Sequence, residues 1–493
     1  MEVDVMNAEK FLILKNPAAA PFAAVPCLSM DDFRAELIAC NGTAAAFFEH
    51  AGKLVAILSS NTDDKIFVTS TPVPEDRRYP ALTPDRPMFH WFERELHEQT
   101  GIVPEGHPWL KPIRFTAEDA KPGVTDYFTM QGCAAHEVAV GPVHAGVIEP
   151  GHFRFQCMGE DVYSLEISLG YQHRGIEKML TGGPDNRTLP VVEAIAGDSS
   201  TAYAGTYCRL LEALDGDCRI SDRSEAIRAI AWELERIANH IGDLGALAGD
   251  VAYLPTASYC GRIRGDVLNT TAMICGNRFG RGLITPEGAG YALDDVRAAE
   301  MLKKLKQTEK DLNNALDLLF DSPSVLDRFE NTGTVSRKTA ADLGLVGMAA
   351  RACGISCDTR STHPYGWYKK SAPAIVTFPD GDVAARAAVR RGELAESYQF
   401  IYHLLENLPP ESESVAPQKR MADAIAISLG EGWRGMICMA AVTDNAGNFA
   451  RFKSVDPSFH NWQGLAMALR GEQISNFPIC NKSFNLSYCG HDL

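Results

Sequence analysis

Side chains that can do proton chemistry gather between residues 141 and 198 of this 493-residue chain. Two short segments hold most of them: GPVHAGVIEPGHFRF, which begins at residue 141, and LEISLGYQHRGIEKML, which begins at residue 165. Imidazole and carboxylate groups transfer protons near neutral pH once burial or a neighbouring charge has shifted their pKa. The candidates in these segments are His144, Glu149, His152, His173, Arg174 and Glu177.

A turn, a strand and a helix must position these side chains. Glycine and proline around residues 141 and 150 predict a tight turn that leads into a strand with inward-facing charged side chains. The next segment, VVEAIAGDSSTAYAGTYCRLLEAL, predicts a helix that runs through Tyr203, Tyr207 and Leu214. Gly197 and Asp198 are expected to cap this helix at its N-terminus.

The decapeptide LGYQHRGIEK matches the signature LGYxHRGxEK of a family of redox subunits. On this match the chain resembles the large subunit of the energy-converting, formate-hydrogenlyase-type (group 4) nickel–iron hydrogenases. It equally resembles the homologous 49-kDa subunit of respiratory complex I. The resemblance implies that Glu177 lies beside the active site and relays protons. The alternative is that His173, Arg174 and Glu177 only tie their helix to the helix bundle.

The resemblance also shows where metal ligands would stand. In those hydrogenases two CxxC pairs supply four thiolates to nickel and iron, because soft sulfur ligands hold such a centre. The matching positions here are Ala196 and Ser199 for the first pair, and Ser487 and Gly490 for the second. None of these side chains is a soft-metal ligand, and Cys489 is out of register. We therefore expect a family member without a nickel–iron site and without a metal in this chain.

Residues 1–125 resemble a second subunit of complex I, the 30-kDa docking module. The run FHWFERELHEQTGIVPEGHP carries the aromatic-rich helix and the GHP element of that family. The predicted fold class is α+β. An α/β module of the 30-kDa type over residues 1–125 is followed by a linker over 126–140. A mainly α helix-bundle domain of the hydrogenase large-subunit or 49-kDa type then covers residues 141–493.

Helical periodicity dominates the middle of the chain. Residues 294–321 predict a long helix with a leucine stripe on one face and lysine and glutamate on the other. Asp222 with Glu225 resembles a capping box at the start of an earlier helix. Further on, the element DTRSTHP matches the family at Asp358, Arg360 and His363, and we expect Asp358 and Arg360 to hydrogen-bond each other beside the cavity.

Composition excludes several classes of protein. The net charge of −16 argues against nucleic acid as a partner. The N-terminus has no signal-peptide pattern, and no run of about 18 apolar residues predicts a membrane span. We therefore expect a peripheral protein that other subunits hold on the cytoplasmic side of the inner membrane. The thirteen cysteines include no CxxC pair, so this chain is not expected to carry an iron–sulfur cluster.

Two functions stay open at this stage. In the first, the chain is the redox-active large subunit of a complex I-like oxidoreductase complex that has lost hydrogen chemistry. Electrons would come from an iron–sulfur cluster in a partner small subunit of the complex I 20-kDa type. Ile148 and Gly197 replace the quinone-binding residues of complex I, so the acceptor is a quinone or another oxidant. The chain itself has no GxGxxG for NADH.

In the second, the chain is a non-catalytic subunit that couples a redox arm to antiporter-like and quinone-channel-like membrane-arm subunits. In this second case the old cavity acts only as a conformational relay. A third hypothesis, a hydrogenase with unfamiliar ligands, is disfavoured because serine and glycine do not replace thiolates at a soft-metal site. In the first case the cavity would keep eleven ionisable groups: His144, Glu149, His152, His173, Arg174, Glu177, Asp198, Asp358, Arg360, His363 and Asp492.

Overall fold

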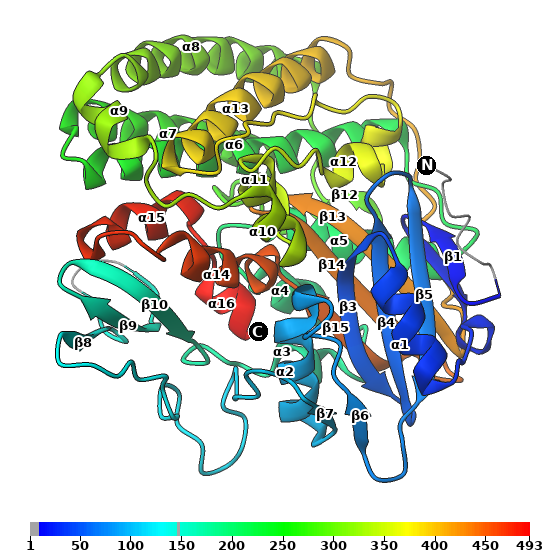
Figure 1. The fold of residues 1–493 in the computed structure, drawn as a ribbon. Coiled ribbons are helices and arrows are strands. Elements are labelled where there is room, and N and C mark those ends of the chain that lie inside the picture. Colours follow the sequence, from blue (N-terminus) through cyan, green and yellow to red (C-terminus); the bar gives the residue numbers. More distant parts are fainter. Residues whose placement is uncertain (1–8, 145–147) are drawn as a thin grey trace.

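The computed structural model describes residues 9–144 and 148–493. Residues 1–8 of the expected docking module and 145–147 of the expected turn lie outside the described residues. Long helices form a layer along one side of the molecule, with strands packed beneath them (Figure 1). Over the described residues, no helix has both the length and the apolar character needed to cross a membrane. The fold is α+β, as predicted.

The N-terminal domain is built on an antiparallel sheet of order β1-β5-β4-β3. Helix α1 packs on β5 and α2 packs on β3. Phe33 and Leu37 are the buried side chains of α1, and Ser29 caps this helix by accepting a hydrogen bond from the amide of Asp32. The elements are β1 (Leu12–Lys15), α1 (Met30–Ala39), β3 (Gly42–His50), β4 (Lys53–Ser60), β5 (Lys65–Pro72), β6 (Arg78–Pro80), α2 (His90–Thr100) and β7 (Val103–Glu105).

One N-terminal strand belongs to the other domain. β2 (Ala18–Pro21) pairs with β13 and completes a second antiparallel sheet of order β15-β14-β13-β2. Asn16, which precedes it, donates buried hydrogen bonds to the carbonyls of His363 (2.7 Å) and Leu429 (2.9 Å). The first residues of the chain are therefore tied to the second domain by strand pairing and by buried hydrogen bonds. The other strands are β13 (Ala424–Gly432), β14 (Gly435–Thr443) and β15 (Phe449–Val455).

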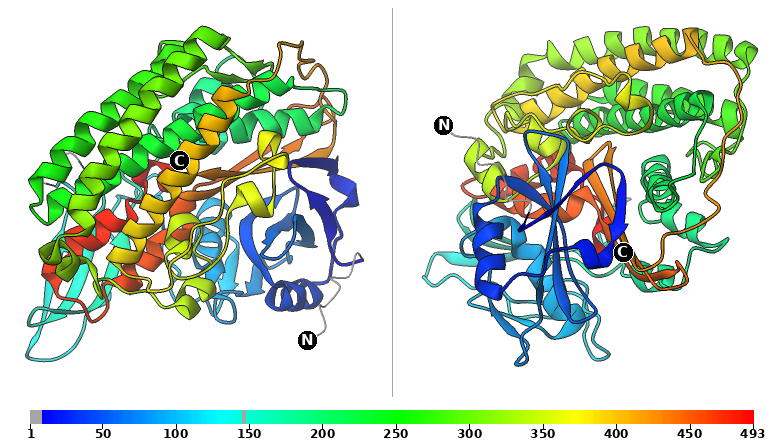
Figure 2. Two further views of the ribbon diagram at one scale, coloured as in Figure 1. Left: turned by 90° about the horizontal axis from the view of Figure 1, so that it is seen from above. Right: turned by 90° about the vertical axis from the view of Figure 1, so that its right-hand side faces the viewer.

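The helix layer consists of α6, α7, α8 and α13, and the N-terminal domain lies to one side of it (Figure 2). The predicted helix over 294–321 is confirmed as α8 (Asp295–Phe320), and its leucine stripe is buried. The expected capping box at Asp222 is wrong: the hydroxyl of Ser221 caps α6, while Glu225 pairs with Arg209. The remaining bounds are α6 (Asp222–Asp250), α7 (Leu254–Cys275) and α13 (Val383–Glu406).

The site described below is framed by shorter elements between this layer and the sheets. A three-stranded antiparallel sheet of order β10-β9-β8 lies beside the C-terminal helices (Figure 1). Its strands are β8 (Ala135–Val140), β9 (His152–Met158) and β10 (Asp161–Ser168). The framing helices are α3 (Ile176–Leu180), α4 (Thr188–Glu193), α5 (Ser200–Leu214), α14 (Pro457–Ala468), α15 (Phe477–Phe484) and α16 (Tyr488–Asp492). The others are α9 (Pro323–Phe329), α10 (Arg337–Asp342), α11 (Gly347–Arg351) and α12 (Thr359–Thr362).

Candidate functional site

The two segments aligned with the metal-ligand pairs of hydrogenases lie together, although almost 300 residues separate them. Arg174, which precedes α3, joins them. Its guanidinium donates to the carbonyls of Ala194 (2.7 Å) and Ile195 (2.8 Å) on one side and to that of Cys489 (3.1 Å) on the other. The fold therefore brings the start of α5 and the start of α16 to one place, as the resemblance implied.

The residues at this place do not fit a nickel–iron centre. Ser487 caps α16, because its hydroxyl accepts a hydrogen bond from the amide of Gly490 (2.9 Å). A side chain at Gly490 would overlap the carboxylate of Asp456, which itself accepts hydrogen bonds from Tyr203 and from the amide of Ser458. Asp456 thus fills the space that a cysteine would need at Gly490.

The first pair of positions and the nearby thiol supply no soft ligand either. Ala196 offers a methyl group, and the hydroxyl of Ser199 donates to Asp198 (3.1 Å). Burial and the neighbouring Glu149 raise the pKa of the Cys489 thiol to about 12, so that it stays protonated at neutral pH. Cys489 is a single thiol that lies between the two aligned positions, so it does not replace the four thiolates of such a centre.

An ion pair stands beside these positions. The guanidinium of Arg434 makes two hydrogen bonds of 2.7 Å to the carboxylate of Asp198, and its Nε donates to the carbonyl of Asn485 (2.6 Å). It also lies over the ring of Trp433, 3.8 Å from the ring centre. Burial alone would raise the pKa of Asp198, but the charge and hydrogen bonds of Arg434 outweigh it and lower this pKa. Asp198 is therefore an ionised anchor and not the helix cap that we expected.

Glu235 on α6 takes over that capping role. Its carboxylate accepts hydrogen bonds from the amides of Thr201 (2.7 Å) and Ala202 (3.2 Å) in the first turn of α5. Burial raises the pKa of Glu235 to about 8, and the negative charge of Asp198 adds to this effect. A carboxyl group with such a pKa exchanges protons near neutral pH. In the sequence Glu235 belongs to the segment ELERIANH, which the resemblance places near the cavity, but a solvated ion-pair face explained it equally well, and it was not among the eleven candidates.

A narrow cavity opens beside Glu235. Its volume of about 10 Å³ is close to the smallest space that holds one water molecule. Asp198, Asn239 and Thr201 also line it, as do the side chains of Arg264 and Arg278. A water molecule at this place would have the polar partners that it needs.

Glu177 lies in a different environment from the one expected. Its carboxylate is bound by Lys453 (2.9 Å), by Arg451 (3.2 Å) and by the amide of Ser454 (3.1 Å). Burial would raise the pKa of Glu177, but the charges of Lys453 and Arg451 outweigh it and lower this pKa to about 2. A carboxylate that stays ionised at neutral pH does not take up a proton there. The surroundings of Glu177 therefore disfavour the relay role and favour that of an anchor, which ties α3 to β15.

Three other predicted residues hold the C-terminal segment in place. Glu149 accepts hydrogen bonds from the amides of Tyr488 (3.3 Å) and Cys489 (3.2 Å). A ring nitrogen of His173 is 2.7 Å from the carbonyl of Asp492, whose own carboxylate accepts from two amides of the loop at residues 170–172. Glu149 and Arg174 therefore hold the start of α16, and the contacts of His173 and Asp492 hold its end.

His144 and His152 lie where the turn meets β9. A ring nitrogen of His144 is 3.0 Å from the carbonyl of Gly151, and one of His152 is 3.2 Å from the carbonyl of Gly141. Burial lowers the pKa of His152, so its ring is neutral at neutral pH. Both imidazoles therefore link residues 141–144 to residues 151–152.

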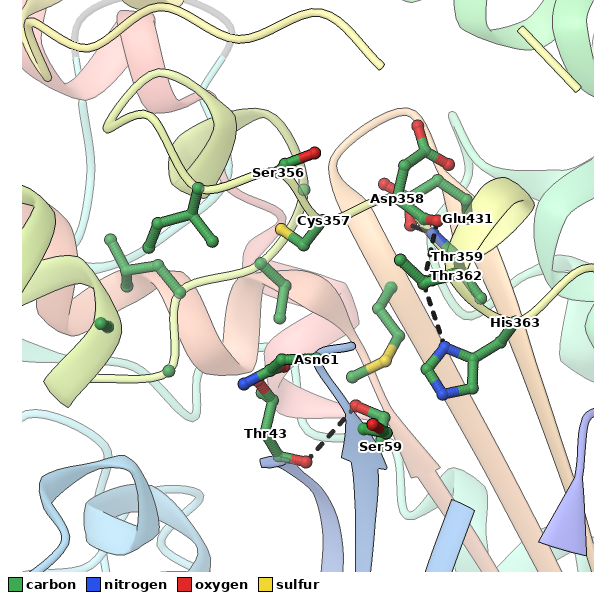
Figure 3. Close-up of a pocket in the computed structure, with 18 of the residues that line it drawn as sticks. Thr43, Ser59, Asn61, Ser356, Cys357, Asp358, Thr359, Thr362, His363 and Glu431 are labelled. Atoms are coloured by element: carbon green, nitrogen blue, oxygen red, sulfur yellow. Dashed lines mark hydrogen bonds between the residues drawn. The ribbon is translucent and has the colours of Figure 1, made fainter. Parts of the chain in front are cut away.

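The DTRSTHP element belongs to a second group of residues. The expected pairing is present: Arg360 binds Asp358 through two hydrogen bonds of 3.0 Å and 2.6 Å and also reaches Glu233 (3.0 Å). His363 contacts the carbonyl of Lys65 in the N-terminal domain (3.1 Å). Among the described residues, no hydrogen bond or ion pair links Asp358, Arg360 or His363 to the residues around Asp198. Asp358 and His363 line the cavity between the domains that Figure 3 shows.

Comparison with known proteins agrees with both halves of this fold. Residues 11–127 match the family model "Respiratory-chain NADH dehydrogenase, 30 Kd subunit" and residues 250–426 match "Respiratory-chain NADH dehydrogenase, 49 Kd subunit". The fused C/D protein of the NADH-quinone oxidoreductase of Bacteroides thetaiotaomicron is 30% identical over 428 residues, which are 78% of this chain and 79% of that protein. The chain belongs to the family of fused 30-kDa and 49-kDa subunits of complex I and related hydrogenases.

The chain is also similar to hydrogenase subunits. Formate hydrogenlyase subunit 5 of Escherichia coli is 26% identical over 435 residues, covering 83% of this chain and 76% of that protein. The carbon monoxide-induced hydrogenase of Rhodospirillum rubrum is 28% identical over 353 residues, covering 71% of this chain and 98% of that protein. The predicted family, fold class and assignment to complex I-like oxidoreductases are thus confirmed.

Proposed function

We propose that this chain is the large subunit of a membrane-associated, complex I-like oxidoreductase complex that works without a nickel–iron site. Electrons pass from an iron–sulfur cluster in a partner small subunit of the 20-kDa type to a quinone or another acceptor, and this transfer is coupled to membrane-arm subunits. The observation that carries the proposal is the replacement of the metal position. Asp456 fills the space beside Gly490, and the hydroxyls of Ser199 and Ser487 are already engaged.

The proton chemistry of the proposed reaction is assigned to Glu235. Its carboxyl group lies at the N-terminus of α5, where it lines a water-sized cavity together with Asp198 of the Asp198–Arg434 ion pair. In this scheme Arg434 and Arg174 keep together the two segments that align with the metal-ligand pairs of hydrogenases. Glu235 donates or accepts the proton that accompanies each electron. Glu177 acts as an ionised anchor.

A second function is favoured by one specific observation. Glu177 and Asp198, which the resemblance made candidates for chemistry, are both held as carboxylates by buried cations. Fixed ion pairs of this kind suit a subunit that transmits force between a redox arm and a membrane arm without reacting itself. The alternative is therefore a non-catalytic coupling subunit.

Metal analysis and one pair of variants test these proposals. The intact complex, purified from its host, should contain iron but no stoichiometric nickel, and should not reduce a dye with H2. Stoichiometric nickel would overturn the proposal. The variant Glu235→Gln should assemble normally but lose electron transfer to its acceptor, while Glu300→Gln, on the exposed face of α8, should retain it. Full electron transfer in the assembled Glu235→Gln complex would favour the coupling subunit.

A further inference from the structure

A cavity with a volume of about 290 Å³ lies between the two domains. Thr43, Ser59 and Asn61 of the N-terminal domain face Ser356 and Cys357 of the second domain across it (Figure 3). The volume is at the lower end of the range of small-molecule sites, about 300–1,000 Å³, and admits a chain of about six carbons with a polar head group. Neither a metal position nor Glu235 borders this cavity.

The lining of the cavity divides into an apolar part and a polar part. Met88, Leu345, Val346, Ile355 and Met436 supply the apolar part. Such surface favours an occupant with a hydrocarbon body, because apolar area removed from water contributes about 25 cal/mol per Å². A ligand that is polar throughout would make no apolar contacts with these side chains.

The acidic groups of the polar part are already satisfied. Asp358 is paired with Arg360. Glu431 is bound by Arg351 (2.8 Å) and accepts a hydrogen bond from the amide of Thr359 (3.0 Å). Their negative charges are therefore compensated from behind the cavity wall. A ligand does not have to supply a cation for them.

The hydrogen-bond donors of the polar part, in contrast, can still bind a ligand. Among the residues described, the guanidinium of Arg337 forms no hydrogen bond and no ion pair, and it stands at the exposed rim of the cavity. The side-chain oxygen of Asn61 accepts from Thr43 (2.9 Å), which leaves the amide hydrogens of Asn61 without a partner in the described part of the chain. A free guanidinium and a free amide both recognise oxyanions, and arginine binds them in a bidentate manner.

We propose that this cavity is a binding site for a small organic anion with a short hydrocarbon body. The oxyanion head pairs with Arg337 and Asn61 at the rim, and the hydrocarbon body lies against Met88, Leu345 and Met436. Since the ligand touches both domains, its binding stabilises their contact. This site is independent of the electron-transfer function proposed above, and it exists whether the chain is catalytic or only couples the two arms.

Calorimetric titration of the full chain tests the proposal with three probes that share a six-carbon chain: hexanoate, hexyl phosphate and hexanol. Hexanoate or hexyl phosphate is expected to bind with one site per chain, and the tighter of the two identifies the head group as carboxylate or phosphate. Hexanol should bind at least about tenfold more weakly, because it forms no charge-assisted hydrogen bond.

Variants locate the site. Arg337→Gln should weaken binding of the anion at least about tenfold, because the charge-assisted pairing with the guanidinium is lost. Lys338→Gln is the matched control, because Lys338 is the next residue, is exposed and pairs with Asp342 outside the cavity. The affinity of this variant for the anion should equal that of the wild type. Ala341→Phe, at an exposed lining position, should block all three probes. The absence of binding by both anions, or equal affinities of the Arg337 and Lys338 variants, would overturn the proposal.

Discussion

Replacing Glu235 by glutamine removes one titratable group but keeps a side-chain oxygen, which can accept hydrogen bonds from the amides of Thr201 and Ala202. The usual pKa of this carboxyl is 4.5, and burial raises it to about 8 in the folded chain. Between these two values the folded state holds a proton that the unfolded state has lost. Raising the pH within this window therefore destabilises the wild-type protein, and the effect is complete above about pH 8.

The magnitude follows from the same pKa values. One pKa unit corresponds to about 1.36 kcal/mol, so the wild-type chain should lose at most about 2.7 kcal/mol relative to Glu235→Gln between about pH 5.5 and about pH 7.5. The loss of one capping oxygen costs the variant about 1 kcal/mol, but this cost does not change with pH. The free energy of unfolding of the variant, relative to that of the wild type, should therefore increase steadily as the pH rises.

Urea unfolding of the full chain at several pH values, followed by tryptophan fluorescence, measures this difference. Glu300→Gln serves as the control, because Glu300 is exposed on α8 and pairs with Lys304. The difference between Glu300→Gln and the wild type should stay constant. A difference between Glu235→Gln and the wild type that is also constant, or that falls with rising pH, would refute the assignment of Glu235 as a carboxyl group that titrates near neutral pH.

Two further variants test the anchors. Glu177→Gln removes a buried partner of Lys453 and should lower the free energy of unfolding by about 3 kcal/mol at pH 7. Because the pKa of Glu177 is lowered to about 2, this loss of stability should shrink as the pH falls from 4.5 towards 2. Thermal unfolding at a series of pH values measures the change. Gly490→Ala should destabilise the chain by about 1–3 kcal/mol through overlap with Asp456. The control Gly216→Ala meets no atom within 4 Å, and equal urea midpoints for the two alanine variants would contradict the view that Asp456 fills the metal position.

Local patterns in the chain were sufficient for helix α8 and for the family. The leucine spacing over residues 294–321 predicted α8 to within one residue at each end, because a helix that packs on one face repeats its apolar side chains every turn. The pairing of Asp358 with Arg360 was also predictable, since two residues of one short turn meet without help from the rest of the fold. The lack of thiolates at Ala196, Ser199, Ser487 and Gly490 could be read directly from the letters.

The roles of the charged residues were decided by partners distant in sequence. Arg434 is 236 residues away from Asp198 in the sequence, and Lys453 is 276 residues away from Glu177. The local sequence therefore does not indicate that either carboxylate is held in its ionised form. Glu235 acquires its raised pKa from burial against the first turn of α5, which depends on how α5 and α6 pack. A sequence states which groups can ionise, but a pKa depends on solvation and on nearby charges, and only the tertiary structure supplies both.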